Sequence, residues 1–103
     1  MGNLLIYLKV HETENGDIIA MCDQALIDKV LEEGKIMLDI KRYAEFYKGT
    51  LINGEEFQKG SRKVISANIV GREAIDAAIE NMLIDEGHVK TVAGIPYAHA
   101  YRV

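Results

Sequence analysis

Residues 4–10 read Leu-Leu-Ile-Tyr-Leu-Lys-Val, a run that is apolar at nearly every position and predicts a β-strand buried on both faces. A polar stretch follows and ends in Asn15-Gly16, a pair typical of tight turns. Residues 18–22, Ile-Ile-Ala-Met-Cys, predict a second strand. The N-terminal part of the chain is therefore expected to form an antiparallel hairpin.

The next segment carries the signals of a helix and then of a strand. Asp23 is a good N-cap, because its carboxylate can accept a hydrogen bond from a free backbone N–H. Residues 24–31 place apolar side chains four residues apart, which predicts a helix that Gly34 ends. Residues 36–40 alternate apolar and polar side chains and predict a half-buried strand.

Two further helices are predicted in the middle of the chain. Asn53 and Glu56 resemble a capping pair, which starts a helix expected to reach Ala67. Residues 68–71 interrupt it, and a third helix is expected over about 72–84. The buried stripe of this third helix is expected to consist of Ile75, Ala78, Ile79 and Met82.

Two C-terminal strands complete the predicted fold. Residues 89–93 and 97–103 have strand composition, and Gly94-Ile95-Pro96 between them marks a turn, because proline fixes φ and cannot continue a helix. The predicted order is β-β-α-β-α-α-β-β. It indicates one α+β domain over residues 1–103, with a mixed, mostly antiparallel sheet of about five strands and about three helices.

Composition and charge narrow the class of protein. The chain of 103 residues is 49% apolar, which suits one globular domain, and no stretch approaches the roughly 20 apolar residues of a membrane span. No secretory signal is visible and the one cysteine cannot form an internal disulfide, so a cytoplasmic location is expected. The net charge of -4 disfavours a strongly basic nucleic-acid binder. Residues 35–72 nevertheless hold eight Lys and Arg against four Asp and Glu, a local excess that an anionic partner could use.

Cys22 is a candidate nucleophile because it immediately precedes the helix predicted to begin at Asp23. A helix N-terminus can lower the pKa of a thiol, and His99 could then act as a base. The alternative is that Cys22 is a small buried strand residue and Asp23 merely a cap, since free cysteines are among the most buried residue types. The three histidines and one cysteine lack metal-ligand spacing, so no metal and no cofactor are predicted.

The turn before the third predicted helix is a candidate anion site. Free N–H groups at Asn68 and Gly71, together with Arg72, could hold an anion at the start of that helix. The alternative is a purely structural turn in which Gly71 supplies a positive φ. In that case Asn at position 71 is expected to be tolerated better than Val.

Basic and aromatic side chains alternate in the middle of the chain, an arrangement that can stack a nucleobase and hold its phosphate. Phe46 and Tyr47 could equally well fold back and cover a sheet edge. The candidate nucleic-acid-binding residues are Lys41, Arg42, Tyr43, Phe46, Tyr47, Lys48, Arg62, Lys63 and Arg72.

Four segments give the chain a resemblance to a known family. They are Ala20-Met21-Cys22-Asp23, Phe46-Tyr47-Lys48-Gly49, Ala67-Asn68-Ile69-Val70-Gly71 and Gly94-Ile95-Pro96-Tyr97-Ala98. In their order and spacing, over essentially the whole chain, they resemble the archaeal proteins grouped as domain of unknown function 424. One departure is Tyr97, where the family pattern usually has histidine; here a histidine follows at His99. The resemblance implies an uncharacterised cytoplasmic archaeal protein associated with translation and ribosome biogenesis.

Three functions remain open on the sequence. The leading hypothesis is a non-enzymatic module that binds RNA or a ribonucleoprotein through the basic and aromatic residues. The second is a small enzyme that uses Cys22 with Asp23 and His99. The third is a module that pairs with another protein or with itself through an exposed strand edge.

Overall fold

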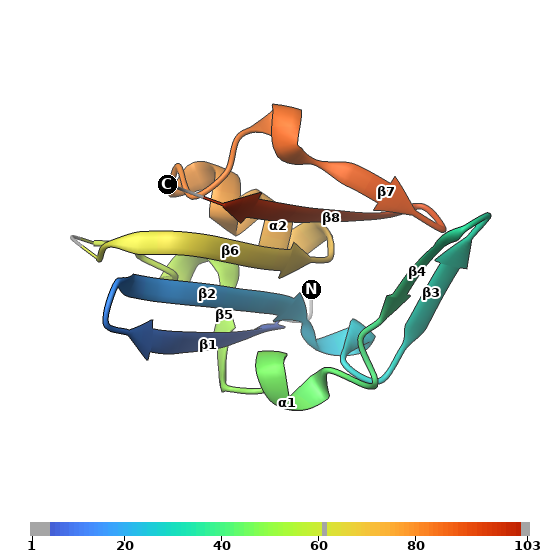
Figure 1. Cartoon of the computed structure of the whole chain (residues 1–103), viewed down its shortest axis with the longest axis horizontal. Helices are drawn as coiled ribbons and strands as arrows, with labels where there is room; N and C mark the ends of the chain where they lie inside the picture. The colour runs from blue at the N-terminus through green and yellow to red at the C-terminus, as the bar shows by residue number, and fades with distance from the viewer. Residues whose placement is uncertain (1–4, 61, 102–103) are drawn as a thin grey trace.

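The computed structural model describes residues 5–60 and 62–101 (Figure 1). Leu4 at the start of the first predicted strand, and residues 102–103 at the end of the last one, lie outside this range. Among the described residues, no helix is long and apolar enough to cross a membrane.

A six-stranded sheet forms the centre of the molecule, with strands in the order β5-β1-β2-β6-β8-β7. The strands are β1 (Leu5–Thr13), β2 (Gly16–Asp23), β5 (Thr50–Asn53), β6 (Val64–Val70), β7 (Lys90–Val92) and β8 (Ile95–Tyr101). The pairing of β2 with β6 is parallel, and the other four pairings are antiparallel. The predicted hairpin of β1 and β2 is confirmed, and its strands pair from Ile6 with Asp23 to Thr13 with Gly16.

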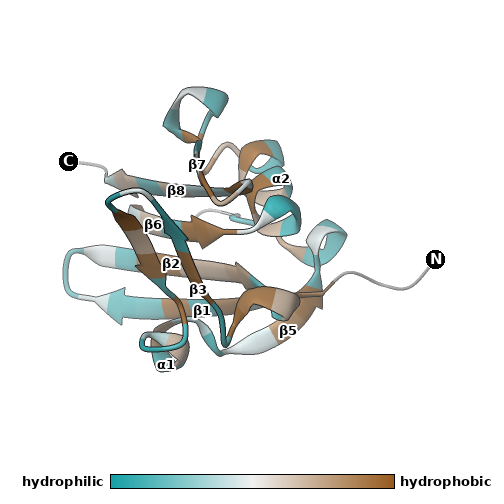
Figure 2. Ribbon diagram, turned by 90° about the vertical axis from the view of Figure 1, so that its right-hand side faces the viewer, coloured by the Kyte–Doolittle hydropathy of each residue, from teal (hydrophilic) through white to brown (hydrophobic). Residues whose placement is uncertain are grey.

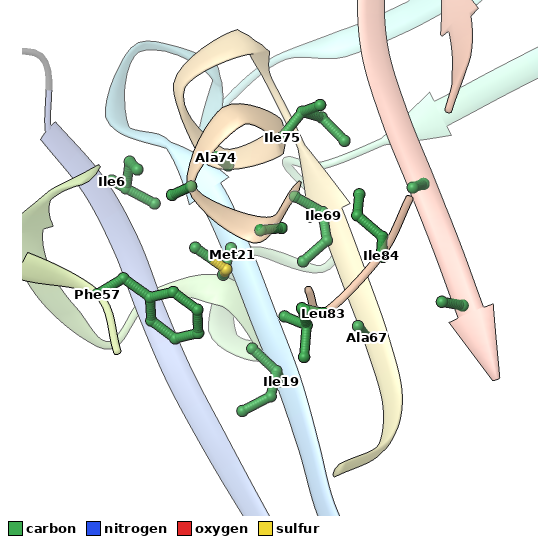
Figure 3. Close-up of a cluster of buried hydrophobic side chains, with 14 of the residues drawn as sticks. Ile6, Ile19, Met21, Phe57, Ala67, Ile69, Ala74, Ile75, Leu83 and Ile84 are labelled. Carbon is green, nitrogen blue, oxygen red and sulfur yellow. The ribbon is translucent and has the colours of Figure 1, made fainter. Parts of the chain in front are cut away.

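Helix α2 (Arg72–Glu80) covers one face of the sheet and buries the main hydrophobic core. Ile19 and Met21 of β2 and Ile69 of β6 point toward this helix, as Figure 3 shows, and all three are fully buried. Alternate residues of the same strands point to the opposite face, because successive strand side chains alternate. That second face therefore holds Ala20, Cys22 and Val70.

A second layer covers part of this opposite face. It consists of the one-turn helix α1 (Ala44–Tyr47) and a separate hairpin of β3 (Val30–Glu33) and β4 (Ile36–Asp39). Figure 2 shows this hairpin crossing in front of the sheet instead of lying beside its strands. Ile27, Ile40 and Tyr47 of this layer are buried against the sheet.

The helix predicted over residues 24–31 is wrong. The chain forms a single 3-10 turn, Gln24–Leu26, and then enters β3. Asp23 makes no side-chain hydrogen bond to this turn. A short apolar run fits a strand as well as a helix, so the partner strand β4 decides the outcome.

The helix predicted from Asn53 to Ala67 is also wrong. Asn53 and Glu56 do form a reciprocal capping box, but around one 3-10 turn, Gly54–Glu56. The chain then becomes extended and enters β6, whose β-branched side chains suit a pleated, buried surface.

The third predicted helix is present as α2 but ends at Glu80. Ile75 and Ala78 are buried as predicted, whereas Met82 is 81% exposed and was placed wrongly in the buried stripe. The amide of Asn81 donates to the carbonyl oxygens of Ala77 and Phe57, so it holds the end of the helix. The 3-10 turn Glu86–His88 then leads into β7. The described residues thus form two α-helices and eight strands, and the α+β class with a mostly antiparallel sheet is confirmed.

Candidate functional site

The carboxylate of Asp23 occupies the turn between β6 and α2. Asp23 ends β2 beside the end of β6, and its two carboxylate oxygens accept from Ala74 N at 2.8 Å and Glu73 N at 3.2 Å. Gly71 N donates to Pro96 O at 2.8 Å. Gly71 has a φ of 108°, so the expected positive φ is confirmed. Three of the N–H groups that an external anion would use at the start of α2, those of Gly71, Glu73 and Ala74, are therefore already engaged.

Cys22 is fully buried on the second face of the sheet. Burial, with a smaller effect of the neighbouring Asp23 carboxylate, raises the pKa of the thiol to about 12. His99 lies two strands away, because Cys22 pairs with Val70, and Val70 pairs with Tyr97. Two strand spacings are about 10 Å, beyond the reach of a hydrogen bond between the two side chains. The structure thus does not bring the proposed nucleophile and base together.

We expect Cys22 to resist thiol reagents in the folded protein at pH 7, because the reactive thiolate is scarce and the sulfur is enclosed. Reaction with a chromogenic disulfide should be at least about a hundredfold slower in the native protein than in urea. Fast native labelling at pH 6.5 would contradict this prediction, since it would require an exposed thiol of lowered pKa.

The aromatic residues around α1 divide into buried and accessible ones. Tyr47 is buried, which raises its pKa to about 12. Phe46 stacks on His11 with ring centroids 4.6 Å apart, and His11 Nε2 lies 2.9 Å from Phe46 O. Tyr43 is 55% exposed, and the Arg42 guanidinium lies 5.7 Å from the centre of its ring. Tyr43 is therefore the most exposed aromatic residue of this group, with the Arg42 guanidinium over its ring.

The basic candidates do not form one surface. Lys41, Arg42 and Lys48 are exposed around α1. Arg62 lies just before β6 and pairs with Asp17 at 3.6 Å, with Lys63 next to it. Arg72 instead follows the other end of that strand, and seven strand residues span about 20 Å.

A groove of about 380 Å³ opens between β4, α1 and the exposed part of the sheet. Met37, Leu38 and Ile40 supply apolar lining from β4 and the residue after it. Seven further residues line it from the two layers: Asp39, Tyr43, Phe46, Tyr47, Asn68, Val70 and His99. Lys41 and Arg42 are exposed and lie in the sequence between Ile40 and Tyr43, which both line this groove.

Asn68 and His99 face the groove as cross-strand neighbours on β6 and β8. The Asn68 side chain is half-buried and makes no hydrogen bond to any residue that the structure describes. The His99 ring packs edge-on against Tyr97 at 5.9 Å. Partial desolvation, and then the charge of Lys90, lower the pKa of His99 below its ordinary value. The half-buried amide of Asn68 and the neutral imidazole of His99 are therefore available to form hydrogen bonds with a ligand in the groove.

Sequence reasoning singled out Asn68 and His99 for other roles and missed that they share this groove. The missed signal is the alternation of side-chain direction along β6. It points Asn68 to the face of the sheet opposite the core residues Ala67 and Ile69. Within residues 5–60 and 62–101, no three His, Cys, Asp or Glu side chains gather as metal ligands.

Comparison with known proteins agrees with the sequence resemblance. No curated protein is similar to the chain. A crystal structure of an uncharacterised conserved protein from Methanopyrus kandleri has a similar fold, with a TM-score of 0.74 and 22% identity, over 96% of this chain and 92% of the other. The model of the family described as protein of unknown function (DUF424) matches residues 10–103. The chain therefore belongs to the DUF424 family.

Proposed function

We propose that the protein binds single-stranded RNA by holding an unstacked base in the groove between α1, β4 and the sheet. The observation that carries the proposal is the amide of Asn68, which lines a groove with aromatic side chains and makes no hydrogen bond to any described residue. A nucleobase needs a flat apolar contact together with hydrogen-bonding groups at its edge. Tyr43 offers the first, and Asn68 and His99 offer the second.

The positive charges near the groove support the proposal that the base belongs to an RNA strand. The chain carries a net charge of -4, yet Lys41 and Arg42 are exposed beside the groove. These cations would contact the backbone phosphates of a strand whose base enters the groove. A base inside a duplex is stacked and cannot enter such a site, so single-stranded RNA should bind in preference. The proposal extends to ribonucleoproteins of the cytoplasm, including those of translation, that expose such a strand.

Fluorescence anisotropy with labelled single-stranded and duplex RNA at low salt tests the proposal. Tyr43→Ala should weaken single-strand binding by roughly 5- to 100-fold, the usual effect of losing one stacked base. Asn68→Asp has the same shape but no donors, and should weaken binding by a comparable factor. Binding of the unaltered protein should weaken steadily as salt rises.

Two double variants that each remove two positive charges distinguish phosphate contacts beside the groove from a general electrostatic attraction. Lys41→Ala with Arg42→Ala should weaken binding at least about tenfold, because two phosphate contacts are lost. Arg62→Ala with Lys63→Ala removes the same charge far from the groove and should have little effect. Equal losses for the two double variants, or no binding of the unaltered protein at high micromolar concentration, would refute the proposal.

A further inference from the structure

A second hollow of about 370 Å³ lies next to the groove. The two share Met37, Leu38 and His99 as lining residues, so they are neighbouring cavities. The character of the lining changes from one to the other. The groove has aromatic walls, whereas the second hollow is lined by His88, Lys90 and Tyr97 in addition to His99.

Lys90 gives the second hollow a fixed positive charge. It pairs directly with Tyr97 across β7 and β8, so their side chains lie on the same face of the sheet. Its ammonium makes no ion pair or hydrogen bond with any part of the chain that the structure describes. It is close enough to His99 to lower the pKa of that imidazole. An exposed cation beside further polar side chains is suited to an anion.

His88 adds a donor to this hollow. Asp85 N donates to His88 Nδ1 at 3.1 Å, so the neutral ring carries its proton on Nε2. Asp85 Oδ1 lies 3.3 Å from the same Nδ1, on the side of the ring away from Nε2. Among the residues that the structure describes, no carboxylate lines the hollow itself: Asp39 lines the neighbouring groove, and Glu33 accepts from Ala93 N at 2.6 Å. The nearest carboxylate to its donors is that of Asp85, which faces Nδ1 of His88 and leaves Nε2 to an anion.

We propose that the second hollow binds a phosphate group, and that it holds the phosphate of the same nucleotide whose base occupies the groove. Lys90 supplies the charge, and His88, Tyr97 and His99 supply hydrogen bonds. That the base occupies the groove rests on the proposed function. That a phosphate binds in the second hollow rests on this hollow alone. Because Met37, Leu38 and His99 line both cavities, the base and the phosphate of one nucleotide could occupy the two sites together.

Three titrations followed by NMR test the inference. Adenosine, adenosine monophosphate and inorganic phosphate are each added to the protein, and the shifts of the amide and imidazole signals are measured. The monophosphate should bind on the order of tenfold more tightly than the nucleoside, because a charge-assisted contact is added. Lys90→Gln should abolish this difference and leave the affinity for adenosine unchanged. Lys63→Gln removes the same charge just before β6, at an exposed residue that lines neither hollow, and should preserve the difference.

The outcomes separate this inference from the proposed function. RNA binding with equal affinities for adenosine and its monophosphate would overturn the phosphate site and leave the base groove standing. A monophosphate preference that survives in Lys90→Gln would overturn it as well. Shifts of His88 and His99 with inorganic phosphate, lost in Lys90→Gln, would support the phosphate site even if adenosine and RNA fail to bind.

Discussion

Replacing Gly71 by Ala is expected to destabilise the protein by roughly 3–5 kcal/mol, the sum of a strained backbone and an overfilled site. Gly71 has a φ of 108°, which side-chain-bearing residues rarely adopt. A Cβ at this position would also overlap the carboxylate of Asp23. Urea unfolding followed by circular dichroism measures the loss, which is a large part of the 5–15 kcal/mol typical of a domain.

Gly34→Ala is the matched control for this variant. Gly34 also has a positive φ, 60°, but a Cβ there would meet nothing within 4 Å. Its replacement should cost only about 1–2 kcal/mol, the penalty of the left-handed conformation alone. The close approach of Gly71 to Asp23 would be wrong if both variants lost the same amount.

The geometry at Gly71 also revises the sequence-based expectation for asparagine. Asn is tolerated in the left-handed region near a φ of 57°. A φ of 108° lies well outside that region, and the overlap with Asp23 applies to any Cβ. Gly71→Asn should therefore be nearly as costly as Gly71→Ala.

Features that depend on neighbours in the sequence could be predicted. The turn at Asn15-Gly16 and the apolar runs on either side determined the first hairpin. The spacing of Asn53 and Glu56 predicted their capping box, although not the length of the helix it begins. The predicted positive φ of Gly71 is also confirmed, although the turn follows strand β6 and not the helix expected to end at Ala67.

Features that depend on distant partners could not be predicted. Residues 64–70 become a strand because they pair in parallel with β2, a contact that no local pattern indicates. Asp23 looks like the cap of the next helix, yet it caps α2, fifty residues further along the chain. The groove is similarly nonlocal, because β4, α1, β6 and β8 each contribute side chains. Tyr43 could be named as a candidate from its basic neighbours alone, whereas the pairing of Asn68 with His99 required the sheet register.

Asp23→Ala is expected to cost about 2–3 kcal/mol. The variant leaves Glu73 N–H and Ala74 N–H without their acceptor in a partly buried site, and it removes a negative charge from the N-terminus of α2. Thermal and urea unfolding should both show the loss. Glu73→Ala changes a charge in the same turn but keeps both backbone N–H donors and the Asp23 carboxylate, so it should stay within about 0.5 kcal/mol of the unaltered protein.

The contribution of Asp23 should also depend on pH. Burial raises the pKa of this carboxyl above its ordinary value of 3.8, against the lowering effect of the bonds from Ala74 and Glu73. The folded state therefore holds the proton more tightly than the unfolded state. The stability linked to this group is present below pH 3.8 and is lost as pH rises through the raised pKa. The stability difference between the unaltered protein and Asp23→Ala should be larger at pH 3.5 than at pH 7.

Combining the two substitutions isolates the contact between Gly71 and Asp23. In Asp23→Ala the carboxylate is gone, so a Cβ at position 71 has room and only the unfavourable φ remains. Gly71→Ala should therefore cost about 1–3 kcal/mol less in the Asp23→Ala background than in the unaltered protein. Additive losses would mean that the backbone conformation alone demands glycine. A loss in the double variant that is clearly smaller than the sum of the two single losses would instead show that one close contact fixes the end of β2, the turn after β6 and the start of α2 together.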